Sequence, residues 1–220
     1  MSRFLERLKR YPTSVANGLL VHKVLLLMRS VGFVIEPYYF YQEGPFRSVP
    51  SGKFVDFTFM ELGVESHSAI AELYPVPPSR GELRARFNEG QKCFALKRGE
   101  RIAALSWCET VQIGFEPCRR PLEKYEAYLF GAETLFEFRG RRLQPYLRCR
   151  CYEALEADGR SLLYSYSDYF NYPARRFKER LGARILFTGL NLRLFGLWKK
   201  NWILRKRAEV KSIPSPEGKK

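Results

Sequence analysis

An apolar run, a basic loop and a helix pattern follow one another between residues 125 and 159. The run from Tyr125 to Leu135 is apolar on both faces, which is typical of a strand buried inside a sheet. Pro145 suits the first position of a helix, and Asp158-Gly159 supplies its end. We therefore predict strand, loop and helix in that order. The apolar face of this helix would hold Leu147, Cys151, Ala154 and Leu155.

The loop between them, residues 139–145, has the character of an anion-binding site. The free N–H groups and the positive dipole end of a helix favour a phosphate group. Arg139, Arg141 and Arg142 add positive charge to the same place. The pattern predicts a pyrophosphate as the ligand.

Two segments of the sequence resemble motifs of the GCN5-related N-acetyltransferases, the GNAT superfamily. The stretch 139–144 is similar to the family's acyl-CoA loop, Q/R-x-x-G-x-G/A, although Arg142 and Gln144 stand where the family usually has small residues. The stretch 171–183 resembles the family's N-x-x-A-x-x-L-Y-x-x-L-G-F block, with Lys178 at the position of the frequent Tyr. The positions of this block that match are Asn171, Ala174, Leu181 and Gly182.

The resemblance covers roughly residues 54 to 195 and implies an α+β fold. We expect a mixed, mostly antiparallel central sheet with splayed strands and flanking helices, together with an N-terminal helical extension. The co-substrate would be acetyl-CoA or another acyl-CoA, with backbone groups of Leu135 and Phe136 holding the pantetheine and acyl carbonyl. The implied cofactor-binding residues are Leu135, Phe136, Arg139, Gly140, Arg141, Arg142, Leu143, Gln144, Asn171 and Arg175.

Acyl transfer to an amine needs a base for the ammonium proton and an acid for the departing thiolate. Glu133, late in the predicted strand, is the leading candidate for the base, with Glu126 and Glu109 behind it. Because Lys178 replaces the usual Tyr, other tyrosines become candidates for the acid; these are Tyr164, Tyr166, Tyr169 and Tyr172. Two interpretations of Arg142 and Gln144 stay open: the loop wraps CoA, or the larger side chains obstruct the site and leave a fold without catalysis.

The rest of the chain predicts the elements of one domain. Residues 1–50 would form a helical or extended segment packed on the core, residues 51–211 the acyltransferase domain, and residues 212–220 a disordered tail. Within 1–50, helical patterns run over 2–11 and 15–29. Tyr38 to Tyr41 is an extended pairing segment or part of a substrate wall, and packing in the core is the preferred interpretation. The expected later elements are a strand over 54–62 with Val55, Phe57 and Phe59 on one face, two short helices within 66–88, a hairpin of 93–96 with 102–113, a strand over 161–169 and a helix over 172–181 capped by Asn171. Residues 184–207 would form a pair of strands, or one strand followed by a basic amphipathic segment.

The net charge of +15 attracts anions, but it does not choose among them. Five cysteines without a C-x-x-C pair and only two histidines predict reduced thiols and no metal site. The apolar stretch 18–35 is interrupted by charges, so we expect neither a membrane-spanning helix nor a signal peptide. These features predict a cytoplasmic protein.

Three functions remain at this stage. The first is an N-acyltransferase acting on a primary amine of a small molecule or amino sugar. The second is an acyltransferase at the inner membrane face that modifies a surface-polymer or lipid-linked precursor and touches anionic lipid through its basic ends. The third is a protein of the same fold without catalysis. Nucleic-acid binding is disfavoured because no recognised binding motif accompanies the charge.

Overall fold

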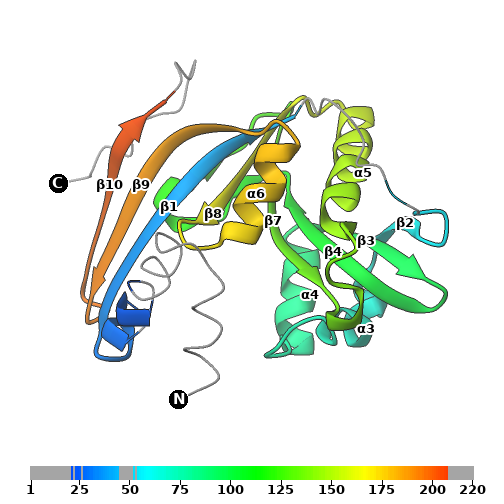
Figure 1. Ribbon diagram of the computed structural model, residues 1–220, viewed down its shortest axis with the longest axis horizontal. Coiled ribbons are helices and arrows are strands. Elements are labelled where there is room, and N and C mark those ends of the chain that lie inside the picture. The colour runs from blue at the N-terminus through cyan, green and yellow to red at the C-terminus, as the bar shows by residue number, and fades with distance from the viewer. Residues whose placement is uncertain (1–20, 22, 26, 45–51, 53, 208–220) are drawn as a thin grey trace.

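One eight-stranded sheet runs through the protein in the order β10-β9-β1-β8-β7-β4-β3-β2 (Figure 1). The computed structural model describes residues 21, 23–25, 27–44, 52 and 54–207. All neighbouring strands of this sheet pair antiparallel except β7 and β8, which pair parallel. The strands are β1 (Phe33–Glu43), β2 (Thr58–Leu62), β3 (Lys92–Arg98), β4 (Arg101–Glu109), β7 (Glu126–Thr134), β8 (Leu162–Asp168), β9 (Arg184–Leu194) and β10 (Trp198–Lys206).

The two parallel strands separate soon after they meet. Their pairing ends at Tyr128 and Tyr164 after three residue pairs, whereas β7 continues to Thr134 and β8 to Asp168. Because parallel strands end at the same edge of a sheet, the segments that follow β7 and β8 begin beside the same opening. The expected α+β fold with splayed strands is thereby confirmed.

Helices cover both faces of the sheet. On one face, α5 (Leu143–Ala157) packs against β3, β4 and β7, and α6 (Tyr172–Arg180) lies beside it. On the other face, α3 (His67–Ala71) and α4 (Arg80–Asn88) bury Ile70 and Leu83 against β3 and β4. The alternation of β3 produces these two cores, because Phe94 faces α5 while Ala95 faces α3 and α4.

Strand β1 lies between β8 and β9, inside the sheet. It belongs to the stretch 1–50, which the sequence predicted as a segment packed on the core. Tyr38 and Phe40 pack with residues of β7, β8 and β9, so the aromatic run is both a pairing segment and part of the core. The helical pattern predicted over 2–11 lies outside the described residues.

Several predicted boundaries hold and others need correction. The two short helices, the hairpin of β3 with β4, the helix α6 and the strand pair β9–β10 are present. The strand expected over 54–62 starts only at Thr58, and Val55 is 97% exposed rather than inward-facing. The strand expected over 102–113 breaks after Glu109, and its last part, β5 (Gln112–Ile113), pairs instead with β6 (Arg120–Pro121) in a separate two-stranded sheet.

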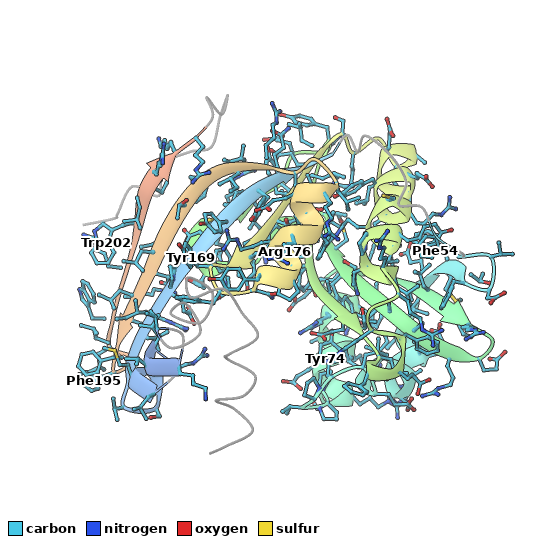
Figure 2. The ribbon with its side chains drawn as sticks, viewed as in Figure 1. Phe54, Tyr74, Tyr169, Arg176, Phe195 and Trp202 are labelled. Carbon is cyan, nitrogen blue, oxygen red and sulfur yellow. The ribbon has the colours of Figure 1, made fainter. Side chains whose placement is uncertain are left out.

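The strand β10 forms one edge of the main sheet. Trp198 and Trp202 lie on it at 45% and 38% exposure, and Figure 2 shows Trp202 at the opposite side of the molecule from Phe54. No helix in the described part of the chain combines the length and the apolar character that crossing a membrane requires.

Candidate functional site

The segment between β7 and α5 is a short, irregular loop. It begins with the 3-10 turn η3 (Phe136–Phe138), and Gly140 and Arg142 then have positive φ values of 79° and 59°. The first backbone hydrogen bond of α5 runs from the N–H of Tyr146 to the carbonyl of Arg142. The N–H groups just before it therefore have no acceptor within the helix. Pro145 is the third helical residue rather than the first, but it still lies in the turn where an N–H would have no helical acceptor.

The arginines of the loop lie on its outer side. Arg139 donates from Nε to the Thr134 carbonyl at 3.2 Å and stacks on the ring of Phe136. Arg141 stacks on Phe138, and Arg142 is exposed. All three arginines belong to the loop that leads into α5, so their charges favour an anion near the first turn of the helix.

Gln144 is turned away from the loop and into the sheet. Its amide donates to the carbonyls of Leu105 and Glu133 and to the Thr134 hydroxyl, at 3.2, 2.5 and 3.1 Å. The amide of Gln144 is therefore held by the sheet and is not free in the loop.

The acceptors of Gln144 lie at a β-bulge between β4 and β7. The pairing shifts register between Leu105 and Trp107, so that Gly131 and Ala132 have no regular partners on β4. Gly131 has φ +54°, and a Cβ atom there would stand 2.9 Å from the Trp107 ring. The sequence prediction missed this bulge, although a glycine inside a strand pattern is a recognised signal for one.

Leu135 and Phe136 were expected to offer backbone groups to a cofactor. The N–H of Leu135 instead donates to Ala103 O at 3.0 Å, and its carbonyl accepts from Phe138 N at 2.9 Å. The carbonyl of Phe136 accepts from Arg139 N. Leu135 therefore has no backbone N–H left to donate to a ligand.

The three candidate bases have different surroundings. Partial burial raises the pKa of Glu133, and the nearby Arg139 lowers it only in part. Burial also raises the pKa of Glu109, which lines a hollow of about 230 Å³ together with residues 89–91 and 110–112. Glu126 is buried, but hydrogen bonds from Arg120 at 2.6 and 2.8 Å overcome the effect of burial and lower its pKa. Glu133 combines a raised pKa with a position on β7 beyond the point where β8 leaves it.

The candidate tyrosines divide in the same way. Tyr164 donates to Glu126 at 3.0 Å, and burial together with that carboxylate raises its pKa to about 12. Tyr166 is 38% exposed and stacks on Phe115 at 3.9 Å between ring centres. Tyr172 lies on α6 under the guanidinium of Arg175. Tyr164 is thus committed to a structural contact, whereas Tyr166 lies on the part of β8 that has left β7.

Asn171 and Arg175 stand at the start of α6. Asn171 accepts a hydrogen bond from Ala174 N at 3.2 Å, which confirms the predicted helix cap. Arg175 donates to the Tyr169 carbonyl and lies over the rings of Tyr39, Tyr169 and Tyr172. Since β7 and β8 are parallel, this helix start faces the same sheet edge as the loop before α5.

A buried polar cluster, which the sequence analysis did not predict, lies behind that edge. It consists of Glu43 on β1, Arg148 and Tyr152 on α5, Ser165 on β8 and Lys178 on α6.

Glu43 is the centre of this cluster. Tyr152 donates to it at 2.6 Å, Ser165 also donates to it, and Arg148 and Lys178 form ion pairs at 3.5 and 3.7 Å. Burial alone would raise the pKa of Glu43, but the two cations and two hydroxyl donors lower it. Burial lowers the pKa of Lys178 to about 7, helped by the charge of Arg148 and opposed by Glu43. A signal for Lys178 was present in the sequence, because helical spacing places it on the same stripe as Ala174 and Leu181.

Comparisons with known proteins concern the fold. No protein-family model and no curated protein matches the sequence. Among solved structures, one from Novosphingobium aromaticivorans assigned to the GNAT family of acetyltransferases is 23% identical, with a TM-score of 0.53, and the match covers 74% of this chain and 66% of that one. A GNAT-family acetyltransferase from Colwellia psychrerythraea is 12% identical, with a TM-score of 0.54 and coverages of 74% and 57%.

A third structure, a GCN5-related N-acetyltransferase from Sphaerobacter thermophilus, is 12% identical with a TM-score of 0.53, and the match covers 81% of this chain and 56% of that one. The present chain therefore matches between 56% and 66% of the length of these three proteins. The chain has the fold of the GNAT acetyltransferases.

Proposed function

We propose that the protein is an N-acyltransferase that uses acetyl-CoA or a related acyl-CoA and acts on a primary amine of a small molecule or amino sugar. The observation that carries the proposal is the coincidence of two features at one sheet edge. There β7 and β8 part after Tyr128 and Tyr164, and α5 begins with free N–H groups and three arginines. A helix end of this kind binds a pyrophosphate, and the opening gives an extended pantetheine a place between the strands.

The residues around the opening fit the needs of the reaction. The loop before α5 holds the phosphates and so fixes the position of the thioester. Glu133 accepts a proton from the ammonium form of the acceptor, directly or through water, before the amine attacks. The described residues contain no cluster of potential metal ligands, and the proposed reaction requires no metal.

A calorimetric titration with acetyl-CoA and longer acyl-CoAs tests the proposal. We expect saturable binding at micromolar concentration, and a panel of amines should then release free thiol from the bound thioester. Changing Arg139, Arg141 and Arg142 together to Ala should weaken binding by about tenfold or more, because charge-assisted contacts to phosphate are lost.

The matched control changes Lys200, Arg205 and Lys206 to Ala on the edge strand β10, which removes the same charge elsewhere. This control should bind acyl-CoA as the unchanged protein does. If no acyl-CoA binds to the unchanged protein, a fold without catalysis becomes the better description.

A second candidate is the same chemistry carried out at the inner membrane face on a lipid-linked or surface-polymer precursor. The exposed Trp198 and Trp202 on β10, with Lys200 between them, favour it, because aromatic and cationic side chains together suit an anionic lipid interface. Co-sedimentation with vesicles containing phosphatidylserine is the test, and removal of residues 198–211 should weaken it. Absence of sedimentation leaves the protein as a cytoplasmic enzyme.

A further inference from the structure

The ammonium group of Lys178 donates to a backbone carbonyl of β8 beyond the point where β7 and β8 separate. The N–H of Tyr169 donates to Pro37 O. Every second residue of β8 therefore forms hydrogen bonds with β1, and these residues are Tyr169, Ser167 and Ser165. By the alternation of an antiparallel pair, the carbonyl of Tyr166 points the other way, toward β7. Since β7 has already separated there, the carbonyl faces the opening, and Lys178 Nζ donates to it at 2.6 Å.

The same nitrogen belongs to the buried cluster. Lys178 also donates to Ser165 Oγ at 2.8 Å, and Ser165 donates in turn to Glu43. Lys178 is 3% exposed and is held above the Tyr41 ring at 5.0 Å. Its position is therefore fixed by contacts from β1, β8 and its own helix.

The cluster contains one more cation than anion when Lys178 is protonated. Arg148 keeps its charge at all physiological pH values, and Glu43 supplies the single carboxylate. The phenol groups that face the cluster, Tyr41 and Tyr152, stay neutral because burial raises their pKa values. Loss of one proton from Lys178 would leave a balanced Arg148–Glu43 pair, so the cluster favours release of that proton.

We propose that Lys178 is the acid that gives its proton to the departing CoA thiolate. This inference rests on the proposed function and assigns a further catalytic residue to that site. When the amine nitrogen attacks the acyl carbon, the C–N bond forms, the C–S bond breaks and sulfur keeps the electron pair. Lys178 Nζ gives one proton to that sulfur, and the products are the amide and free CoA thiol.

Proton transfer in this direction is favourable. An ordinary alkyl thiol has a pKa of about 8.5, whereas the pKa of Lys178 is lowered to about 7. The proton that the amine nitrogen loses passes to Glu133 or water, and Lys178 regains a proton from solvent after the thiol leaves. Glu43 and Ser165 act through Lys178 and are positioning residues.

The test compares Lys178→Met with the unchanged protein. Methionine has a similar length and leaves Arg148 balanced by Glu43, so this variant should fold. We expect unchanged affinity for acetyl-CoA by calorimetry and a decrease in kcat of about 100-fold. At a constant concentration of unprotonated amine, kcat/KM of the unchanged protein should fall as pH rises past about 7, and this limb should be missing in the variant.

The control is Arg180→Met, which removes an exposed cation from the same helix and should change neither kcat nor its pH dependence. A Lys178→Met protein that binds acetyl-CoA and turns over within twofold of the unchanged protein overturns the role of Lys178 and leaves the proposed function intact. Failure of the unchanged protein to bind acetyl-CoA overturns the proposed function itself.

A second measurement needs no variant and no acceptor amine. In protein labelled with ¹³C at the lysine ε-carbons, Lys178 is recognised by its titration near pH 7, far below the other lysines. Binding of CoA should shift this resonance and its titration midpoint, and desulfo-CoA, which lacks the sulfur, should shift them less. Equal shifts with the two ligands would show that Lys178 does not face the sulfur.

Discussion

Lys178 shows how strongly surroundings can change one side chain. On a helix surface it would be an ordinary cation, but here α5, α6, β1 and β8 enclose it with Arg148 and Glu43. The folded protein must therefore hold an unbalanced positive charge at low pH, and that charge costs free energy. The cost disappears as the amine loses its proton.

This cost predicts how stability depends on pH. The pKa of Lys178 is about 7 in the folded protein and about 10.4 in the unfolded chain, so above pH 7 the unfolded chain binds more protons. The free energy of unfolding should then rise between pH 7 and 8.5 by roughly 1 kcal/mol per pH unit from this group. Urea unfolding of Lys178→Met should lack this increment. An equal slope in both proteins would contradict the prediction.

Glu133 permits a second prediction at this scale. Exchange of Glu133 for Gln removes the proposed base and should lower kcat by about 100-fold while acetyl-CoA binding stays unchanged. In the unchanged protein, activity should decline as the pH falls through the pKa of Glu133, which burial holds above its ordinary value. Glu126→Gln should instead lower stability, because it breaks the contacts with Arg120 and Tyr164.

At the scale of elements, the junction of β7 with α5 depends on one amide. Gln144 joins the first turn of α5 to the bulge between β4 and β7 by donating to three oxygen atoms. The junction thereby fixes the direction in which the helix presents its free N–H groups. A change at Gln144 should affect stability and ligand affinity together.

The exchange Gln144→Glu keeps the shape of the side chain but replaces the donor amide with an oxygen that faces three acceptors. We expect it to destabilise the protein by about 2 to 3 kcal/mol, because buried acceptors lose their donor and meet a like charge. Gln144→Met, which lacks both donor and charge, should cost less. Denaturant unfolding gives the two values, and a smaller loss in the Glu variant would contradict the account.

At the scale of the whole molecule, the sheet is continuous only because of β1. This strand pairs with β8 on one side and β9 on the other, and it brings Glu43 into the buried cluster. Without it, the aromatic core around Tyr38 and Phe40 would lose a strand that contacts both β8 and β9. We therefore expect the part of the chain that most resembles the acetyltransferase motifs to be incomplete as a folding unit.

Two fragments test this statement. A fragment of residues 51–207 should lack cooperative unfolding by circular dichroism, because β8 and β9 lose their shared partner. A fragment of residues 21–207 keeps β1 and should unfold cooperatively. Cooperative unfolding of the shorter fragment would show that β1 is dispensable.

The sequence predicted individual strands and helices better than the contacts between them. The run before the loop, the helix after it and the cap at Asn171 depend on neighbouring residues, and the structure confirms them. The position of β1 could not be predicted, because it is set by pairing with strands more than 100 residues away. The cluster around Glu43 could not be predicted for the same reason, since its members come from four separate elements.

The candidate site shows the same limit. Spacing predicted a helix start with three arginines, and that arrangement is present. Residue spacing does not show which backbone groups are already hydrogen-bonded within the fold. The backbone of Leu135 was therefore expected to be free for a ligand, although it is hydrogen-bonded to Ala103 and Phe138. Hydrogen-bond partners across a sheet depend on register, which a bulge at Gly131 shifts by a residue.

The distribution of tryptophan provides an optical readout that needs no attached dye. Trp107 is fully buried at the bulge and donates to the Tyr74 hydroxyl at 2.9 Å, whereas Trp198 and Trp202 lie together on the distant edge strand. A polar quencher such as iodide reaches the exposed pair and spares the buried indole. The remaining emission then comes mostly from the β4–β7 bulge, so a change in the packing of this bulge can be followed by fluorescence in the unmodified protein.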